Sequence, residues 1–299
     1  MGLSEKLNQV EKLSKGGRIG RFLHHPYKYL YAQLIARVVY RQTGILKKAD
    51  TFFQDQMSLL LPASTDIYLT GGKTHESEIR LARFLLNTIN SKDIIIDVGA
   101  HFGYFTLLFS KLAYAGHVYA FEPSRTNFDI LSLNANRDNI TIYNSAVSYK
   151  NEPLTFFEFP TLFSESNSLY TDQYLDEEWF KHTAYKEIIV DCVTLDNFCQ
   201  KNALSPNFVK IDVEGAEKDV IHGARDIINR SSPAIAMEFV CPERKNANHH
   251  LAKDLLYSLG YKSYVIGEDG SLSVIEDIND YLLCKNLESD NIIFMSKPV

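Results

Sequence analysis

The fold is decided by the stretch Ile94-Ile95-Ile96-Asp97-Val98-Gly99-Ala100-His101-Phe102-Gly103. Its first three residues are β-branched, which predicts a parallel strand buried on both faces of a sheet. The glycines at 99 and 103 allow a tight turn and let a ligand approach the backbone without a Cβ in the way. Apolar residues at 105, 108, 109 and 112 then follow the helical spacing i, i+3, i+4, i+7. We therefore expect a strand, a glycine-containing turn and a helix in this order.

The same alternation of strand and helix continues toward the C-terminus. Seven strands are predicted for the main sheet, at 94–96, 117–121, 140–143, 208–211, 234–237, 261–266 and 291–295. Repeated βα units indicate an α/β fold with a mostly parallel seven-stranded sheet flanked by helices. The link between the last two strands lacks strong helical periodicity, so we expect these two strands to pair antiparallel.

Two segments depart from this alternation. Residues 1–50 are basic and predicted helical, and they form an N-terminal extension ahead of a main domain at 51–299. The main domain opens with a strand at 57–62 and a helix over 74–89, for which Thr74 is the expected N-cap. Residues 154–193 are predicted as an insertion or strand pair beside the sheet. Within it, 160–187 is the expected substrate-facing loop, and a surface excursion without a ligand role is an equal alternative.

Composition and charge narrow the class of protein. The formal net charge of −6 argues against nucleic acid as a partner, because phosphate binding needs an excess of Lys and Arg. The four cysteines are widely spaced without a CxxC pair, which favours reduced thiols and a cytoplasmic location. No apolar run approaches the ~20 residues of a transmembrane helix. The apolar stretch Tyr27–Tyr40 is expected to pack on its own domain, and peripheral contact with a membrane or a partner is the alternative.

Two acids flank the first predicted βαβ unit. Asp97 precedes the turn, and Glu122 lies 19 residues beyond Gly103, where the second strand ends. An acid in that second position can accept hydrogen bonds from both hydroxyls of a ribose. The G-x-x-x-G spacing lacks the third glycine of a dinucleotide-binding loop, and Asp97 would repel a pyrophosphate. The pattern therefore favours an adenosyl ligand with a cationic amino group over NAD.

A second group of acids follows the fourth strand of the alternation. Asp212, Glu214 and Glu217 lie there, and Glu238 ends the next strand. Because ligands bind beyond the carboxyl ends of such strands, we predict Asp212 and Glu238 as catalytic residues. Either carboxylate can act as a general base, or both can hold a divalent metal that acidifies a hydroxyl; no metal is assigned. Glu214 and Glu217 serve equally well as surface or helix-capping charges, and His101 in the turn is expected to touch the cofactor or substrate.

These motifs resemble the FkbM family of methyltransferases. The matching segments are Asp97–Gly103, Phe121–Pro123, Ser145–Val147, Val209–Glu217 and Val220–Ala224, preceded by Glu78. The resemblance spans roughly 52–239 and is most specific in Val209–Glu217. One departure is His101, where many relatives have Asn.

The resemblance implies a Rossmann-like class I methyltransferase with S-adenosyl-L-methionine as the methyl donor. It implies O-methylation of a hydroxyl, usually of a sugar or a polyketide, as in cell-surface polysaccharide or secondary-metabolite biosynthesis. The cofactor-binding residues that it implies are Glu78, Asp97, Gly99, Ala100, His101, Gly103, Glu122, Ser145, Ala146 and Asp212.

Two other functions remain open from the sequence. One is an NAD- or nucleotide-sugar-dependent enzyme on the same fold. The other is a catalytically silent scaffold in a polysaccharide-assembly complex. The acceptor is expected to be a small molecule or a glycan. Four aromatic residues are candidates to stack on a sugar or to form a core within their own loop, namely Tyr170, Tyr174, Trp179 and Phe180.

Overall fold

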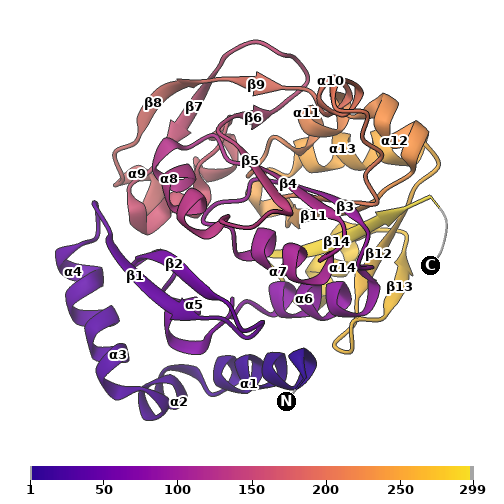
Figure 1. Cartoon of the computed structure of the whole chain (residues 1–299). Helices are drawn as coiled ribbons and strands as arrows, with labels where there is room; N and C mark the ends of the chain where they lie inside the picture. The colour runs from indigo at the N-terminus through magenta and orange to yellow at the C-terminus, as the bar shows by residue number, and fades with distance from the viewer. Residues whose placement is uncertain (1, 297–299) are drawn as a thin grey trace.

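The computed structural model describes residues 2–296, and its centre is an eight-stranded sheet (Figure 1). The strands run in the spatial order β13 (Leu272–Ile275), β12 (Lys262–Ile266), β14 (Ser289–Met295), β11 (Ala234–Val240), β10 (Phe208–Ile211), β3 (Ile94–Val98), β4 (His117–Phe121) and β5 (Ile140–Tyr143). The five strands from β11 to β5 are parallel, and β14 is antiparallel to both β11 and β12. The predicted mostly parallel α/β fold is confirmed, as is the antiparallel pairing of the last two predicted strands. The short edge strand β13 is one strand more than predicted.

Helices cover both faces of the sheet because alternate residues of its strands face opposite sides. On β3, Ile95 belongs to one hydrophobic core and Ile96 to the other, and both are fully buried. The first core takes in α6 (Glu76–Thr88), α7 (Tyr104–Leu112) and α8 (Arg125–Asn134). The second takes in α10 (Leu195–Lys201), α11 (Glu217–His222), α12 (Arg225–Ser231), α13 (Ala247–Ser258) and α14 (Ile278–Lys285). This burial on both sides explains why the strands are so rich in apolar residues.

The N-terminal segment runs along the lower left of the molecule in Figure 1. Its helices are α1 (Leu3–Lys15), α2 (Gly17–His24), α3 (Pro26–Leu30), the π-helix η1 (Tyr31–Ala36) and α4 (Arg37–Val39). The helical prediction for 1–50 is wrong at its end, because β1 (Ile45–Asp50) pairs antiparallel with β2 (Gln56–Leu61). The helix expected from Thr74 begins at Glu76 after α5 (Thr65–Thr70), and its N-cap is His75. Within residues 2–296, no helix has the length and apolar character needed to cross a bilayer.

The predicted strand pair beside the main sheet is confirmed. Strand β7 (Leu154–Glu158) pairs antiparallel with β8 (Lys186–Val190), and the short β6 (Ala146–Val147) pairs with β9 (Cys192–Val193). Between β7 and β8 lie the short helices η2 (Thr161–Ser166), η3 (Asp172–Tyr174) and α9 (Glu178–Lys181), while η4 (Pro242–Arg244) follows β11.

The aromatic residues of this insertion pack on one another. Tyr174 is fully buried, and its ring lies 5.2 Å from Trp179 and 6.2 Å from Phe180. Phe159 contacts all three of these rings. The Tyr170 hydroxyl donates instead to Asp219 at 2.6 Å. Tyr174, Trp179 and Phe180 therefore form a core within the loop, which is the second of the two alternatives stated for them.

Candidate active site

A cavity of about 350 Å³ lies beyond the carboxyl ends of β3, β4, β10 and β11, within the size range of small-molecule sites. The predicted residues that line it are Glu78, Gly99, His101, Glu122, Ser145, Ala146, Asp212 and Glu238. The parallel strands explain this meeting, because their carboxyl ends share one edge of the sheet. Segments separated by more than 150 residues are thereby brought to one site.

Gly99 forms the floor of the cavity where three strands end. Its φ of 80° lies in the left-handed region, and a Cβ would collide with the backbone carbonyl oxygen of Asp212. The N–H groups of Gly99 and Ala100 both donate to the carbonyl of Phe121 at 3.0 Å. A glycine is therefore required here both by its backbone conformation and by the close approach of β10.

Glu122 is a buried carboxylate held from three sides. It is 4% exposed, and its Oε2 accepts from the backbone N–H of His101 at 2.8 Å. Its Oε1 accepts from the N–H of Ser124 at 3.0 Å and from the Asn127 amide at 3.4 Å. Burial raises the pKa of Glu122 to about 7. Oε1 thus already accepts two hydrogen bonds, whereas Oε2 accepts one and keeps a lone pair for a ligand hydroxyl.

Three predicted residues lie behind the wall of this cavity. Asp97 is fully buried, and its Oδ2 accepts from the Thr106 hydroxyl at 2.6 Å. Within the described residues its Oδ1 has no hydrogen-bond partner. Asp97 also borders a separate, very small cavity of about 20 Å³. Ala100 packs against Leu131, and Gly103, which begins α7, has no space for a Cβ beside the same leucine. The structure gives these three a role in the turn, and their contacts with a cofactor remain predictions.

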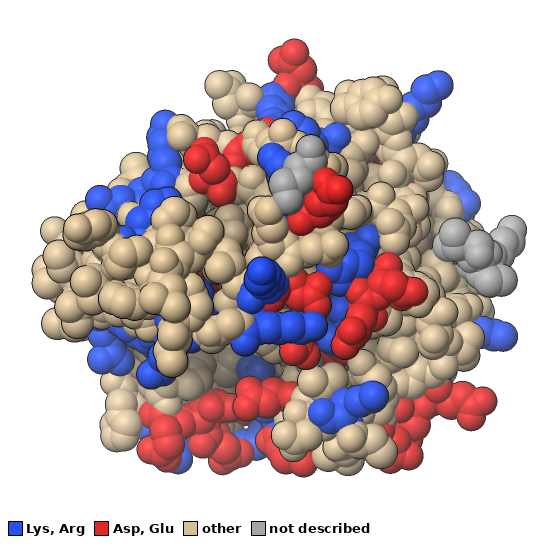
Figure 2. Space-filling view, turned by 90° about the horizontal axis from the view of Figure 1, so that it is seen from below, with Lys and Arg blue, Asp and Glu red and all other residues tan. Residues whose placement is uncertain are grey.

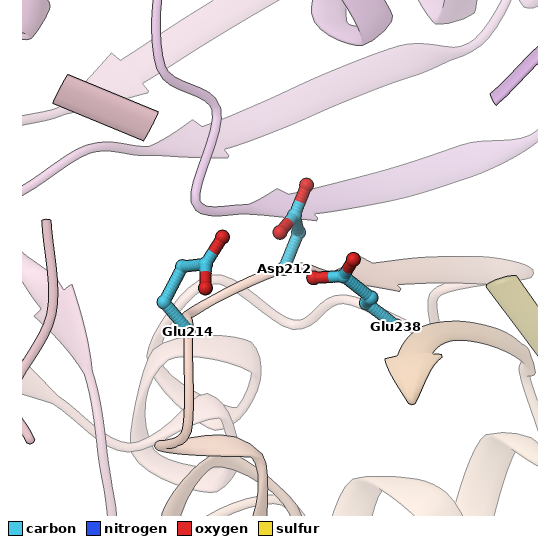
Figure 3. Close-up of side chains that lie close together, drawn as sticks. All are labelled: Asp212, Glu214 and Glu238. Atoms are coloured by element: carbon cyan, nitrogen blue, oxygen red, sulfur yellow. The ribbon is translucent and has the colours of Figure 1, made fainter. Parts of the chain in front are cut away.

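Three carboxylates converge on the opposite side of the cavity. Asp212 follows β10, Glu214 lies two residues later, and Glu238 is on β11 (Figure 3). One oxygen of each lies within 4.8 Å of the others, a donor set of the kind that Mg²⁺ or Mn²⁺ accepts. Glu214 is also tied to the insertion, because its Oε2 accepts from the Tyr174 hydroxyl at 2.6 Å and from the Gln173 amide at 2.9 Å.

The three carboxylates differ in their electrostatic surroundings. Burial alone would raise the pKa of Asp212, but the Lys210 ammonium 2.8 Å from its Oδ2 holds that pKa below its ordinary value. Burial and the negative charge of Asp212 raise the pKa of Glu238. Burial and the charge of Glu238 raise the pKa of Glu214 further. Asp212 is therefore a paired anion, whereas Glu238, with its raised pKa, is a stronger base than Asp212.

His101 faces the cavity as a neutral ring. Its φ is 52°, and its ring stacks on Phe102 with the centroids 3.7 Å apart. One ring nitrogen, Nε2, lies 2.9 Å from the Ser164 hydroxyl of the insertion. Burial lowers the pKa of His101 to about 4, so the imidazole is uncharged near neutral pH.

The chain matches a known family of domains. The model of the FkbM methyltransferase domain matches residues 97–263, which is more than half of the chain. The chain belongs to the FkbM methyltransferase family. Its most specific motif, Val209–Glu217, supplies β10, Asp212 and Glu214 of the site. No curated protein matches this FkbM chain.

Solved structures similar to this chain include methyltransferases of several kinds. The FkbM methyltransferase from Methylobacillus flagellatus is 15% identical over 78% of this chain, with a TM-score of 0.43. This chain covers 52% of that protein, about half its length. Precorrin-6y C5,15-methyltransferase from Geobacter metallireducens is 13% identical over 74% of this chain and 88% of its own, with a TM-score of 0.40. Fibrillarin from Aeropyrum pernix, solved with S-adenosyl-L-methionine, is 14% identical over 72% of this chain and 74% of its own, with a TM-score of 0.39.

Sequence reasoning missed the cations of this FkbM site. Lys210 is 3% exposed within β10, where a lysine between Val209 and Ile211 interrupts an apolar strand and is itself a signal. Lys73 precedes α6, and its ammonium lies 2.6 Å from Glu78 and 3.1 Å from Glu165. The attraction of these two acids raises the pKa of Lys73 against the effect of burial. No local pattern marks Lys73, because its partners lie 5 and 92 residues away.

Proposed function

We propose that this chain is an S-adenosyl-L-methionine-dependent O-methyltransferase. Its proposed acceptor is a hydroxyl of a sugar or glycan in cell-surface polysaccharide or secondary-metabolite biosynthesis. The observation that carries the proposal is a single cavity with carboxylates of different surroundings on its two sides. Glu122 and the Gly99 turn line one side, while Asp212 and Glu238 line the other.

The residues present suit this donor. Glu122 offers the free acceptor site of its Oε2 to a ribose hydroxyl, and Gly99 leaves room for close approach. Ser145 and Ala146 provide a small-residue surface for the adenine. Among the described residues, Oδ1 of Asp97 accepts no hydrogen bond and lies 4.0 Å from the Lys210 ammonium, so it has an acceptor site for a cationic amino group. When bound, S-adenosyl-L-methionine supplies an electrophilic methyl group on a sulfonium.

The chain's own part in the reaction is to position the acceptor hydroxyl and to take its proton. We assign the proton to the carboxylate of Glu238, because burial and the charge of Asp212 raise its pKa and make it a stronger base than an ordinary carboxylate. Asp212, paired with Lys210, stays ionised and orients the hydroxyl. Alignment of hydroxyl and methyl group then supplies much of the rate acceleration.

The acceptor has a place next to this cavity. A second cavity of about 680 Å³ shares Asn127, Ser164 and Asn167 with the first. Its walls come from 41–43 and from the insertion at 158–164 and 182–186. We therefore propose residues 51–299 as the catalytic domain, with 160–187 as the substrate-facing insertion and 1–50 as the extension.

The test is methyl transfer from labelled donor to a panel of glycans and glycolipids, with and without a chelator. Glu238→Gln should lower kcat by about 10²–10⁴-fold while the Kd for the donor changes little. Glu276→Gln, at an exposed position on the far side of β13, is the matched control. Full activity of Glu238→Gln would remove its role as base. A wild-type chain that does not bind the donor would overturn the proposal as a whole.

A further inference from the structure

The N-terminal helices expose a stripe of large apolar side chains. The members recur every three or four residues and are 44–88% exposed, namely Ile19, Leu23, Tyr27, Leu30, Leu34 and Val38. Within α2 to α4 the buried residues are Ala32 and Ala36. The expectation that Tyr27–Tyr40 packs on its own domain thus holds for Ala32, Ala36 and Tyr31 and is wrong for the members of the stripe.

The charge of this segment is opposite to that of the rest of the chain. Residues 12–49 contain nine Lys and Arg and no Asp or Glu, whereas the other residues carry 22 bases and 37 acids. Five of the nine bases are exposed and, within the described residues, have no ion pair, namely Lys12, Arg18, Arg37, Arg41 and Lys48. In Figure 2 the lobe at the left, where Figure 1 places α3 and α4, is almost wholly tan with blue at its margins.

We propose that this stripe and its flanking bases form a docking surface for an anionic lipid bilayer. A helical surface with aliphatic and aromatic side chains on one face and Lys or Arg beside them is typical of segments that lie in the membrane interface. Exposed apolar patches of this extent on a folded protein mark an interaction site. The bases would meet anionic headgroups while Leu23, Leu34 and Val38 enter the acyl boundary.

The charge distribution selects this occupant over a second copy of the chain. Two copies facing each other through this surface would bring two sets of unpaired bases together, at a cost in repulsion. An anionic bilayer attracts the same bases and repels the acidic remainder of the molecule, so it also fixes the orientation. The second cavity, walled partly by Arg41 and Thr43, lies at the end of this segment. A docked molecule would therefore present that cavity near the headgroups.

The experiment is cosedimentation of the full chain with vesicles of phosphatidylcholine, with or without phosphatidylglycerol, at low and high salt. Binding to the anionic vesicles alone, weakened by salt, is the expected result. Changing Arg18 and Arg37 to Gln should weaken it about 25-fold, roughly fivefold for each charge. Control variants at exposed bases elsewhere are Lys92→Gln, Lys201→Gln and Lys262→Gln.

A second set of variants tests the apolar stripe. Leu23→Ser, Leu34→Ser and Val38→Ser together should abolish sedimentation, while Ile189→Ser and Val274→Ser, exposed by 71% and 61%, should not. Donor binding by calorimetry reports on the site independently and should be unchanged in every variant. Absence of binding to anionic vesicles would overturn the proposal. Equal losses of vesicle binding in the test and control variants would also overturn it. A dimer of the wild-type chain that dissociates in the Leu23→Ser, Leu34→Ser and Val38→Ser variant would overturn it as well.

Discussion

Removal of the Lys210 charge should destabilise the fold because it leaves a buried carboxylate without a cation. The Lys210 ammonium lies 2.8 Å from Asp212 and 4.0 Å from Asp97, and Asp97 is fully buried. Loss of one partner from a buried ion pair costs about 3–5 kcal/mol. Lys210→Met, which keeps most of the volume, should therefore lose a large part of a total stability of roughly 5–15 kcal/mol.

The pH dependence separates this electrostatic effect from a packing defect. Burial already raises the pKa of Asp97, and Lys210 is the main group that opposes this. In Lys210→Met that pKa rises further, so the folded chain binds more protons than the unfolded chain as the pH falls from 7 to 5. Stability of the variant then increases relative to the wild type over this window. The deficit should thus be smaller at pH 5 than at pH 7.

The assay is urea unfolding at both pH values, followed by fluorescence of the single tryptophan, Trp179. Lys201→Met, at an exposed lysine, is the control and should cost less than ~0.5 kcal/mol. The double variant Lys210→Met/Asp97→Asn should recover part of the loss. A deficit under ~1 kcal/mol, or one equal at both pH values, would refute the electrostatic account.

Three further outcomes follow from the site. Gly99→Ala should lose at least ~2 kcal/mol more stability in thermal unfolding than Gly260→Ala. Both glycines have positive φ, but a Cβ at 260 meets open space, whereas one at 99 meets the Asp212 carbonyl. Equal losses would contradict the close contact with the end of β10. The acidic limb of the kcat–pH profile should shift to lower pH in Asp212→Asn, because the charge of Asp212 helps to raise the pKa of Glu238; an unmoved limb would exclude Glu238 as the titrating group. Phe159→Ala should lower the free energy of unfolding by about 3–5 kcal/mol, because Phe159 is buried. It should also raise KM for the acceptor with little effect on the Kd of the donor. A change confined to the Kd of the donor would show that the insertion does not border the acceptor.

The sheet could be predicted from the sequence because its strands are short, apolar and separated by helices. β4 and β10 occur at the predicted residues, because a short run of β-branched and aromatic residues between polar turns strongly favours a buried strand. Strand-end residues such as Asp212 and Glu238 could be placed together by the same logic. Their relative basicity could not, because it depends on Lys210 and on burial.

The N-terminal segment shows where local pattern fails. A helical stripe of apolar residues is as compatible with a core as with an exposed face, and the partner that decides between them is outside the stripe. β1 is likewise not predicted, because its sequence Ile-Leu-Lys-Lys-Ala-Asp does not alternate apolar and polar residues although its burial alternates, and its pairing with β2 is a tertiary contact. The N-cap is His75 and not Thr74, whose N–H donates to Asp66 at 3.3 Å and whose carbonyl accepts from the Ser14 hydroxyl at 2.6 Å.

The charge of the first cavity bears on how the donor would bind and how its product would be released. Its lining includes seven acids, namely Glu78, Glu122, Glu165, Asp212, Glu214, Glu238 and Glu288, and only two Lys or Arg, namely Lys73 and Arg244. Burial and, second to it, repulsion by neighbouring acids raise the pKa of Glu214 and Glu238, so a bound cation would relieve that repulsion. The proposed donor carries a sulfonium charge that disappears once its methyl group has left. The same carboxylates that favour entry of the cation would therefore hold the neutral product less tightly, and release would follow from the chemistry itself.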